Sequence, residues 1–141
     1  MRPFQPSPGL LPVAVEEFIR WVTPILNMRR TATRDTEVAG TPVEAGDELL
    51  LMYPSANRDE AVFDAPESFD VGRDPNPHVA FGFGTHFCLG AALARLEIRV
   101  MFEELLPRLR DLRLVPDSPP ERVPNAFVRG FRSLHVAFET A

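Results

Sequence analysis

Residues 81–90, FGFGTHFCLG, surround Cys88, the single cysteine of the 141-residue chain. Gly82 and Gly84 can adopt positive φ angles, which would turn backbone N–H groups toward the sulfur. Cys88 precedes a predicted helix, and the amides and dipole at a helix N-terminus favour a thiolate. Gly90 leaves room for a flat group at the start of that helix, and the phenylalanines would exclude water. A dry thiolate facing a flat group indicates an axial ligand of haem iron.

Other roles for Cys88 stay open at this point. Most lone cysteines are buried structural residues. A catalytic nucleophile is less natural, because no Cys-His-Asn arrangement is evident in the sequence. A zinc site is disfavoured, because His86 and Cys88 are two candidate ligands without a second pair at the usual spacing. The glycine spacing also differs from the dinucleotide-binding pattern G-x-G-x-x-G.

Composition limits the class of protein. A hydrophobic content of 45% with 25% charged residues is ordinary for a soluble globular chain, and the length suits one modest domain with one core. The net charge of −5 argues against a general nucleic-acid binder. No apolar run approaches the roughly 20 residues that span a bilayer. The proline-rich N-terminus is a poor signal peptide, so we expect a cytoplasmic location.

Local patterns predict the order of the elements. A helix is expected over 12–22, because Pro12 suits a helix start and the Thr23-Pro24 pair ends it. After Cys88, apolar residues at roughly 3.6-residue spacing predict a strong helix over 91–109. The other segments are a disordered lead-in over 1–9, short strands within 25–52, a long structured loop over 57–80 and a final β hairpin within 112–139, where Leu134, Val136 and Phe138 alternate.

Three motifs together resemble a known family. FGFGTHFCLG is similar to the cysteine-ligand sequence of the cytochrome P450 family, the haem-thiolate monooxygenases. EEFIR at 16–20 resembles the E-x-x-R helix of that family, and NRDEAVFDAPESFDVGR at 57–73 resembles the segment that leads to its cysteine loop. The motifs occur in family order at family-like spacing. The likeness is strongest to soluble bacterial members, including some that oxidise sterols and fatty acids.

The resemblance implies the fold and the extent of the domain. We expect an α+β chain, mainly α with small β sheets, in which residues 10–141 form the C-terminal haem-binding half of a cytochrome P450 domain. The sequence contains no A/G-G-x-D/E-T pattern, the acid-alcohol pair of the central distal helix. The expectation is therefore a fragment that lacks this helix and is inactive alone.

A structural triad is implied by the E-x-x-R likeness. Glu17 and Arg20 are three residues apart and share one helix face. For an arbitrary pair at this spacing, a solvent-exposed ion pair of small effect would be the expectation. The resemblance instead implies that Glu17, Arg20 and Arg73 form a buried triad that locks the long loop and positions the cysteine.

The resemblance also implies a cofactor, haem b (iron protoporphyrin IX), with Cys88 as the iron ligand. Two cationic residues, His86 and Arg30, are expected at the haem propionates, with Arg29 as an alternative to Arg30. Phe81, Gly82 and Gly90 are expected around the haem. Arg95 is left open between the docking side of an electron donor and an ordinary solvated helix position.

The implied activity is oxygen insertion into a small apolar organic substrate, such as a sterol or fatty acid. Ile25, Leu26, Phe127 and Val128 are expected at the substrate cavity, although a core role would also suit them. A ferredoxin- or flavin-type electron donor is the implied partner, with no nucleic acid and no membrane span. Two alternatives from other classes are a non-enzymatic haem-binding module and a non-functional truncated remnant.

Overall fold

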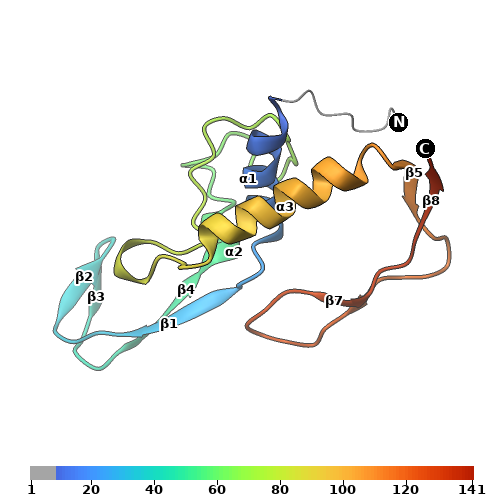
Figure 1. The fold of residues 1–141 in the computed structure, drawn as a ribbon. Coiled ribbons are helices and arrows are strands. Elements are labelled where there is room, and N and C mark those ends of the chain that lie inside the picture. Colours follow the sequence, from blue (N-terminus) through green and yellow to red (C-terminus); the bar gives the residue numbers. More distant parts are fainter. Residues whose placement is uncertain (1–8) are drawn as a thin grey trace.

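The structure is a computed structural model that describes residues 9–141 (Figure 1). The predicted lead-in over 1–9 lies outside the described residues, except for Gly9. Helices and small two-stranded sheets make up the chain, which confirms the predicted α+β class. Within residues 9–141, no helix has the length and apolar character needed to cross a membrane.

The first helix, α1 (Leu11–Val22), confirms the helix predicted over 12–22. Leu11, Val15 and Ile19 recur every four residues and are buried together on one face. The helix ends at Thr23, whose φ of 41° is left-handed and whose N–H donates to the carbonyl of Ile19 over 2.9 Å. Pro24 follows and cannot continue the helix.

Short strands follow, as predicted. β1 (Asn27–Thr31) pairs antiparallel with β4 (Glu48–Met52). Between them, β2 (Thr36–Val38) and β3 (Thr41–Val43) form a second antiparallel pair. Gly40 turns the chain between β2 and β3 with a φ of 80°, which glycine adopts without strain. In Figure 1 these strands project from the helices as an arm.

The predicted long loop is present and is irregular but ordered by contacts. A short helix, α2 (Tyr53–Ala56), precedes it, and turns and extended segments occupy residues 57–83. A single 3-10 turn over Gly84–His86 then leads into the cysteine. In Figure 1 this loop wraps around one side of α1.

The helix after the cysteine, α3 (Ala91–Leu105), is shorter than predicted. The expected range of 91–109 is wrong at its C-terminal end. Pro107 carries no backbone N–H and disfavours helical geometry in the residue before it. Leu109 accordingly begins a strand instead of a further helical turn.

The C-terminal segment forms two ladders where one hairpin was predicted. β5 (Leu109–Leu114) pairs with β8 (Val136–Thr140), and β6 (Glu121–Arg122) pairs with β7 (Phe131–Ser133). Leu134 lies between β7 and β8, so only part of the predicted alternation stands on a strand. Prolines at 116, 119 and 120 interrupt the segment between β5 and β6, because proline cannot donate to a ladder.

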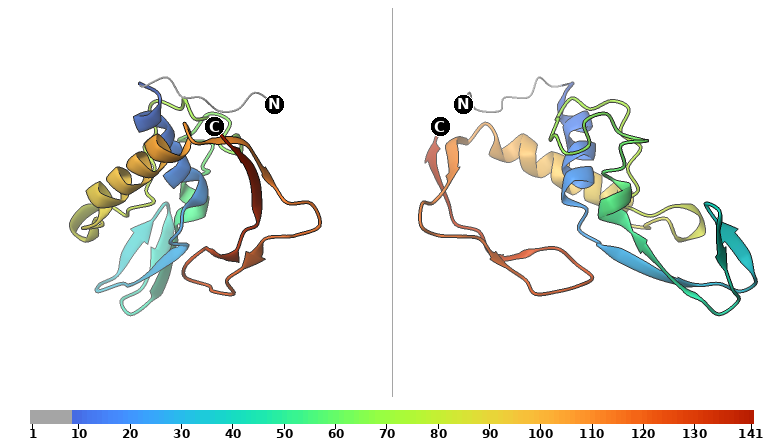
Figure 2. Two further views of the ribbon diagram at one scale, coloured as in Figure 1. Left: turned by 45° about the vertical axis from the view of Figure 1, so that its right-hand side comes forward. Right: turned by 180° about the vertical axis from the view of Figure 1, so that it is seen from behind.

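The apolar core is small and lies where α1 meets α3. Leu11, Val15, Ile19 and Ala80 are buried there, and Phe81, Ile98 and Phe102 pack against them. In both views of Figure 2, α3 crosses α1, while the two strand-bearing arms extend to either side. Many more large apolar side chains are exposed than buried in the part of the chain that the structure describes, including several along α3.

Candidate functional site

Cys88 lies at the end of a tight loop that joins the long irregular segment to α3. Its N–H donates to the carbonyl of Phe81 over 2.9 Å, and its carbonyl accepts from the N–H of Ala91 over 3.2 Å. Gly82 and Gly84 have φ angles of 74° and 70°, as their expected turn requires. These contacts fix the thiol at the N-terminal end of α3.

Some details of this loop differ from the prediction. Gly82 donates its N–H to the carbonyl of Val79 over 2.8 Å and not to the sulfur. Phe83 is 88% exposed and Phe87 is also exposed, so the expected screen of three phenylalanines is reduced to one. Cys88 is exposed as well.

Cys88 lines a cavity of about 610 Å³. This volume falls within the range of about 300–1,000 Å³ that is usual for small-molecule pockets. Its walls come from α1, β1, the cysteine loop and α3, and they are mainly apolar. The lining residues are Ile19, Pro24, Ile25, Met28, Arg30, Tyr53, Ala80, Phe81, Gly82, His86, Cys88, Ala94 and Ile98.

Arg30 and His86, the two residues predicted at the haem propionates, both line this cavity. The alternative, Arg29, forms an ion pair with Glu48 over 2.8 Å between its Nη1 and the carboxylate Oε1. Because successive side chains of a strand point to opposite faces, Arg29 and Arg30 cannot both face the cavity. The structure therefore favours Arg30 over Arg29 as the cavity cation.

The four predicted substrate residues come together, but only Ile25 lines the cavity. Leu26 donates its N–H to the carbonyl of Phe127 over 2.8 Å, and Ile25 pairs with Val128 in an isolated antiparallel bridge. The C-terminal segment is thereby held against the chain that enters β1. Met28, which was part of the same segment in the sequence, lines the cavity as well.

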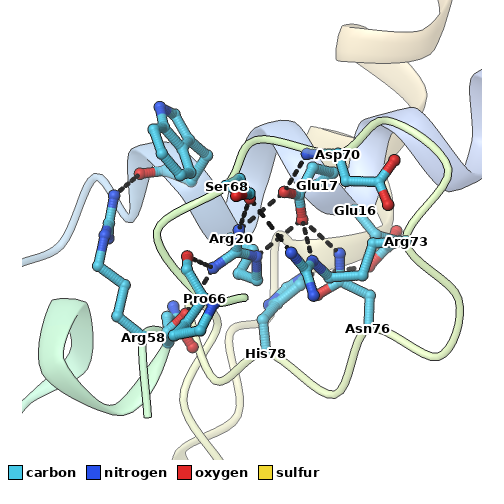
Figure 3. A network of polar contacts seen from close by, with 12 residues as sticks. Glu16, Glu17, Arg20, Arg58, Pro66, Ser68, Asp70, Arg73, Asn76 and His78 are labelled. Carbon is cyan, nitrogen blue, oxygen red and sulfur yellow. Dashed lines mark hydrogen bonds and ion pairs between the residues drawn. The ribbon is translucent and has the colours of Figure 1, made fainter. Parts of the chain in front are cut away.

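The predicted triad forms (Figure 3), with Glu17 and Arg20 fully buried and Arg73 partly buried. Glu17 Oε2 accepts from Arg20 Nε, and Glu17 Oε1 accepts from Arg20 Nη2, both over 2.7 Å. Arg73 Nε donates to Glu17 Oε2 over 3.2 Å. The side chains of Glu17 and Arg20 have no exposed surface. A bidentate pair of this kind has the geometry that makes arginine–carboxylate hydrogen bonds strong.

Glu17 accepts two further hydrogen bonds that the sequence did not reveal. The backbone N–H of Asp70 donates to Oε1 over 2.9 Å, and Asn76 Nδ2 donates to Oε2 over 3.0 Å. Burial by itself would raise the pKa of Glu17, but the hydrogen bond from Arg20, the Asp70 amide and the charges of Arg20 and Arg73 together lower it below its usual value. The carboxylate is therefore held in its charged form.

The arginines of the triad bind loop carbonyls with their remaining donors. Arg20 donates from Nη1 to the carbonyls of residues 57 and 66 over 2.7 and 3.0 Å, and from Nη2 to that of residue 68 over 3.2 Å. Arg73 donates from Nη1 to the carbonyl of residue 64 over 2.8 Å. Figure 3 shows Pro66 and Ser68 of the loop beside the Arg20 guanidinium. The triad thus pairs backbone acceptors of the loop that no strand or helix would pair.

Asn57 joins the two ends of the long loop and was missed in the sequence. Its Nδ2 donates to Thr23 Oγ1 over 2.9 Å, and its Oδ1 accepts from the N–H of Val79 over 2.8 Å. Asn57 and Thr23 are fully buried. A lone asparagine beside an arginine carries no local pattern that would identify it as a buried clamp.

Arg95, left open in the sequence, is paired across the interface of α1 and α3. Its Nε and Nη2 donate to the two carboxylate oxygens of Glu16 over 2.7 and 2.8 Å. Its guanidinium carbon also lies 4.7 Å from the centroid of the Phe81 ring. The Arg95 side chain is still 36% exposed, and its place on the docking side of an electron donor stays a prediction.

The residues of the cavity fit a flat, dianionic group held through its centre. One thiol and two cationic side chains share a mainly apolar wall. A side-chain carbon built at Gly90 would stand 3.9 Å from Cys88 Sγ, so glycine there keeps the space beside the sulfur open. Within residues 9–141, no group of three His, Cys, Asp or Glu side chains could hold a metal ion.

Comparison with known proteins gives a consistent result. The family model described as Cytochrome P450 matches residues 9–135. The chain is 55% identical over 129 residues to the steroid C26-monooxygenase of Mycolicibacterium smegmatis, a match that covers 92% of this chain and 32% of that protein. It is 50% identical over 131 residues to the methyl-branched lipid omega-hydroxylase of Mycobacterium tuberculosis (strain ATCC 25618 / H37Rv), covering 92% of this chain and 30% of that protein.

Solved structures agree. Cytochrome P450-153 from Novosphingobium aromaticivorans superimposes with a TM-score of 0.87 at 47% identity, over 93% of this chain and 33% of that one. CYP109E1 from Bacillus megaterium, solved in complex with testosterone, superimposes with a TM-score of 0.86 at 38% identity, over 91% of this chain and 36% of that one. The chain therefore spans about a third of the length of the curated relatives it matches.

The buried triad predicts a large stability loss when one partner is removed. Arg20→Ala leaves Glu17 charged and without its main donor, so the free energy of unfolding should fall by about 3–5 kcal/mol. Urea unfolding followed by fluorescence of Trp21, the single tryptophan of the chain and a neighbour of the Arg20 guanidinium, measures this change. Arg132→Ala, which breaks the exposed pair with Glu121, is the matched control and should cost under about 1 kcal/mol. Equal losses in the two variants would show that the triad is no more than a surface contact.

The lowered pKa of Glu17 predicts a pH dependence. The charged carboxylate is favoured by folding, so its contribution to stability is fully present above the ordinary value of 4.5 and disappears as the pH falls through the lower folded value. Measured from pH 7 to pH 3, the free energy of unfolding should decline less steeply in acid for Glu17→Gln than for the native chain. Parallel acid profiles would contradict the assignment of this titration to Glu17.

Proposed function

The chain belongs to the cytochrome P450 family, and we propose that residues 10–141 form the haem-binding part of a haem-thiolate monooxygenase. The observation that carries this proposal is the position of Cys88 on the wall of a mainly apolar cavity that Arg30 and His86 also reach. Cys88 would ligate the iron of haem b through its sulfur. Arg30 and His86 would neutralise the two propionates.

The other residues of the cysteine loop would shape the haem surface. Phe81 lines the cavity and holds the Cys88 amide through its carbonyl, so it would pack near the sulfur while fixing the loop. Gly82 lines the cavity, and Gly90 keeps the space beside the sulfur free of a side chain. When bound, the haem would supply dioxygen activation for oxygen insertion into a C–H bond, and a thiolate ligand favours O–O cleavage.

The chain's own contribution is to hold the ligand and the cofactor in place. Glu17, Arg20 and Arg73 would act through the long loop and would not touch the reacting atoms. They gather the carbonyls of the loop, while Asn57 ties its last turn, at Val79, to the end of α1. Because Val79 lies two residues before Phe81, this anchoring fixes where the cysteine loop begins.

A small apolar molecule, a sterol or fatty acid, is the substrate we propose. The names of two relatives, a steroid C26-monooxygenase and a methyl-branched lipid omega-hydroxylase, support this class. In this chain Ile25 and Met28 offer apolar surface to the cavity, and Leu26, Phe127 and Val128 hold that segment in place. A ferredoxin- or flavin-type electron donor and a cytoplasmic location complete the proposal.

We further propose that other protein surface covers the open side of this unit. Apolar side chains on α3, among them Leu93, Leu96 and Val100, are exposed, as are Phe127 and Val128 on the C-terminal segment. Burial of such surface is strongly favourable in water. Residues 1–141 alone would therefore not couple electron consumption to oxygen insertion, because a wall of the cavity and a proton route to bound dioxygen would be missing.

Thiolate ligation by Cys88 predicts a spectroscopic change. The chain is loaded with haem, reduced and exposed to carbon monoxide, and the red-shifted Soret band that is specific for a thiolate ligand is measured. The band should appear in the native chain and vanish in Cys88→Ser, because the chain has no second cysteine to substitute. An unshifted band in the native chain would refute the haem-thiolate proposal, and haem uptake without that band would favour a non-enzymatic haem-binding module.

The geometry of β1 predicts different effects for two neighbouring arginines. Arg30→Gln removes a cavity cation, so it should weaken haem affinity by about tenfold, the order expected for one lost charge-assisted hydrogen bond. Arg29→Gln changes the net charge equally but removes only the exposed pair with Glu48. It should leave haem affinity nearly unchanged in a haem titration. Equal effects of both variants would mean that long-range charge, and not a direct propionate contact, is responsible.

A further inference from the structure

A second polar network, separate from the triad, surrounds Glu16. The carboxylate of Glu16 receives two hydrogen bonds from Arg95 on α3, over 2.7 and 2.8 Å, and its Oε2 lies 3.1 Å from His78 Nε2 on the long loop. One side chain of α1 is therefore joined to α3 and to the loop at once. We call Glu16, His78 and Arg95 the Glu16 junction. Figure 3 shows Glu16 and His78 beside the triad.

His78 has its two ring nitrogens committed to different partners. Nδ1 accepts from the N–H of Ala80 over 3.3 Å, so Nε2 carries the proton that is donated to Glu16. Burial lowers the pKa of His78 in spite of the nearby Glu16 carboxylate, and the neutral ring suits these roles. The imidazole thus connects Glu16 to the backbone one residue before Phe81.

Arg95 reaches the same phenylalanine from the other side. Its guanidinium carbon lies 4.7 Å from the Phe81 ring centroid, within the range of a cation–π contact. The Phe81 carbonyl in turn accepts the N–H of Cys88 over 2.9 Å. Two routes therefore lead from Glu16 to Phe81, one through Arg95 and one through His78, and a single hydrogen bond leads from Phe81 to the cysteine.

Solvent exposure argues against a large contribution of the Arg95–Glu16 ion pair to overall stability. The side chain of Arg95 is 36% exposed and that of Glu16 is 28% exposed, and ion pairs with this much solvent contact add little to the free energy of unfolding. The bidentate hydrogen bonds to Glu16 instead fix the orientation of the planar Arg95 guanidinium over the Phe81 ring.

We propose that the Glu16 junction is a positioning device for the cysteine loop, in which Glu16 orients Arg95 and His78 so that Phe81 holds Cys88 in place. Glu16, Arg95 and His78 are positioning residues, and only Phe81 and Cys88 would meet the bound group. The proposal rests on the proposed haem site for its functional meaning. Its structural content concerns this chain alone and can be tested without haem.

The first test is amide hydrogen exchange of the haem-free chain, read at Cys88. Arg95→Gln and Glu16→Gln should each accelerate exchange of the Cys88 amide by about tenfold, as expected when the support of one hydrogen bond is lost. The intrinsic exchange rate at Cys88 is unaffected, because neither substitution neighbours it in sequence. Interior α3 amides serve as the internal reference. The double variant should exchange no faster than the single ones, because both act on one unit.

The control is Arg99→Gln. Arg99 lies one turn after Arg95 on α3, and the substitution removes only its exposed ion pair with Glu103. It should leave exchange at Cys88 unchanged. Equal exchange at Cys88 in Arg95→Gln, Glu16→Gln and Arg99→Gln would overturn the proposal. Acceleration spread evenly over the chain would overturn it as well, because the junction would then serve general stability.

The second test uses the haem-loaded chain. Outer contacts of a metal ligand typically change metal affinity by about 10- to 100-fold, so haem loss from Arg95→Gln and Glu16→Gln should be faster by about that factor than from Arg99→Gln. The thiolate-specific carbon monoxide band should weaken in the first two variants only. If the native chain lacks this band, the haem proposal fails, while the exchange experiment still decides the role of the junction.

Discussion

The buried contact between Arg20 and Glu17 is the constraint on which the rest of the structure depends. Both side chains are fully enclosed, and removing two charges from water carries a large desolvation cost. That cost is offset because every N–H of the Arg20 guanidinium has an acceptor. The Glu17 carboxylate in turn accepts hydrogen bonds from three side chains and one backbone amide. The arrangement therefore persists only while the loop carbonyls stay in place, and this requirement gives an irregular segment one conformation.

The small size of the apolar core explains why polar contacts, and not hydrophobic burial, order the long loop. Among residues 9–141 the buried apolar cluster consists of Leu11, Val15, Ile19 and Ala80, while the long loop is rich in proline and charged residues. Such a loop cannot be ordered by hydrophobic burial alone. Hydrogen bonds from two arginines to carbonyls at several points of the loop, together with the Asn57 clamp, hold the backbone as strands or helices would elsewhere. The cysteine loop inherits its position from this polar frame.

Two polar networks begin at adjacent residues of α1 and hold different parts of the chain around the cysteine loop. Glu17 faces the body of the loop, whereas Glu16 faces α3 and the last residues before Phe81. Adjacent helix positions point about 100° apart, so one helix can address both without competition. The cavity beside Cys88 then lies where α1, α3, β1 and the loop meet, and its cations come from the strand and from the loop.

The sequence by itself determined the features that depend on local chemistry. Thr23-Pro24 ended α1, Gly82 and Gly84 set the turn before Cys88, and the E-x-x-R spacing paired Glu17 with Arg20. Tertiary structure alone decided which of Arg29 and Arg30 reaches the cavity, that Arg95 binds Glu16, and that Asn57, Asn76 and His78 act as clamps. The physical reason is that the two residues of each contact are separated by between 22 and 79 positions in the sequence. Their acceptors are carboxylate, hydroxyl and amide oxygens of isolated side chains, which leave no periodic pattern in the sequence.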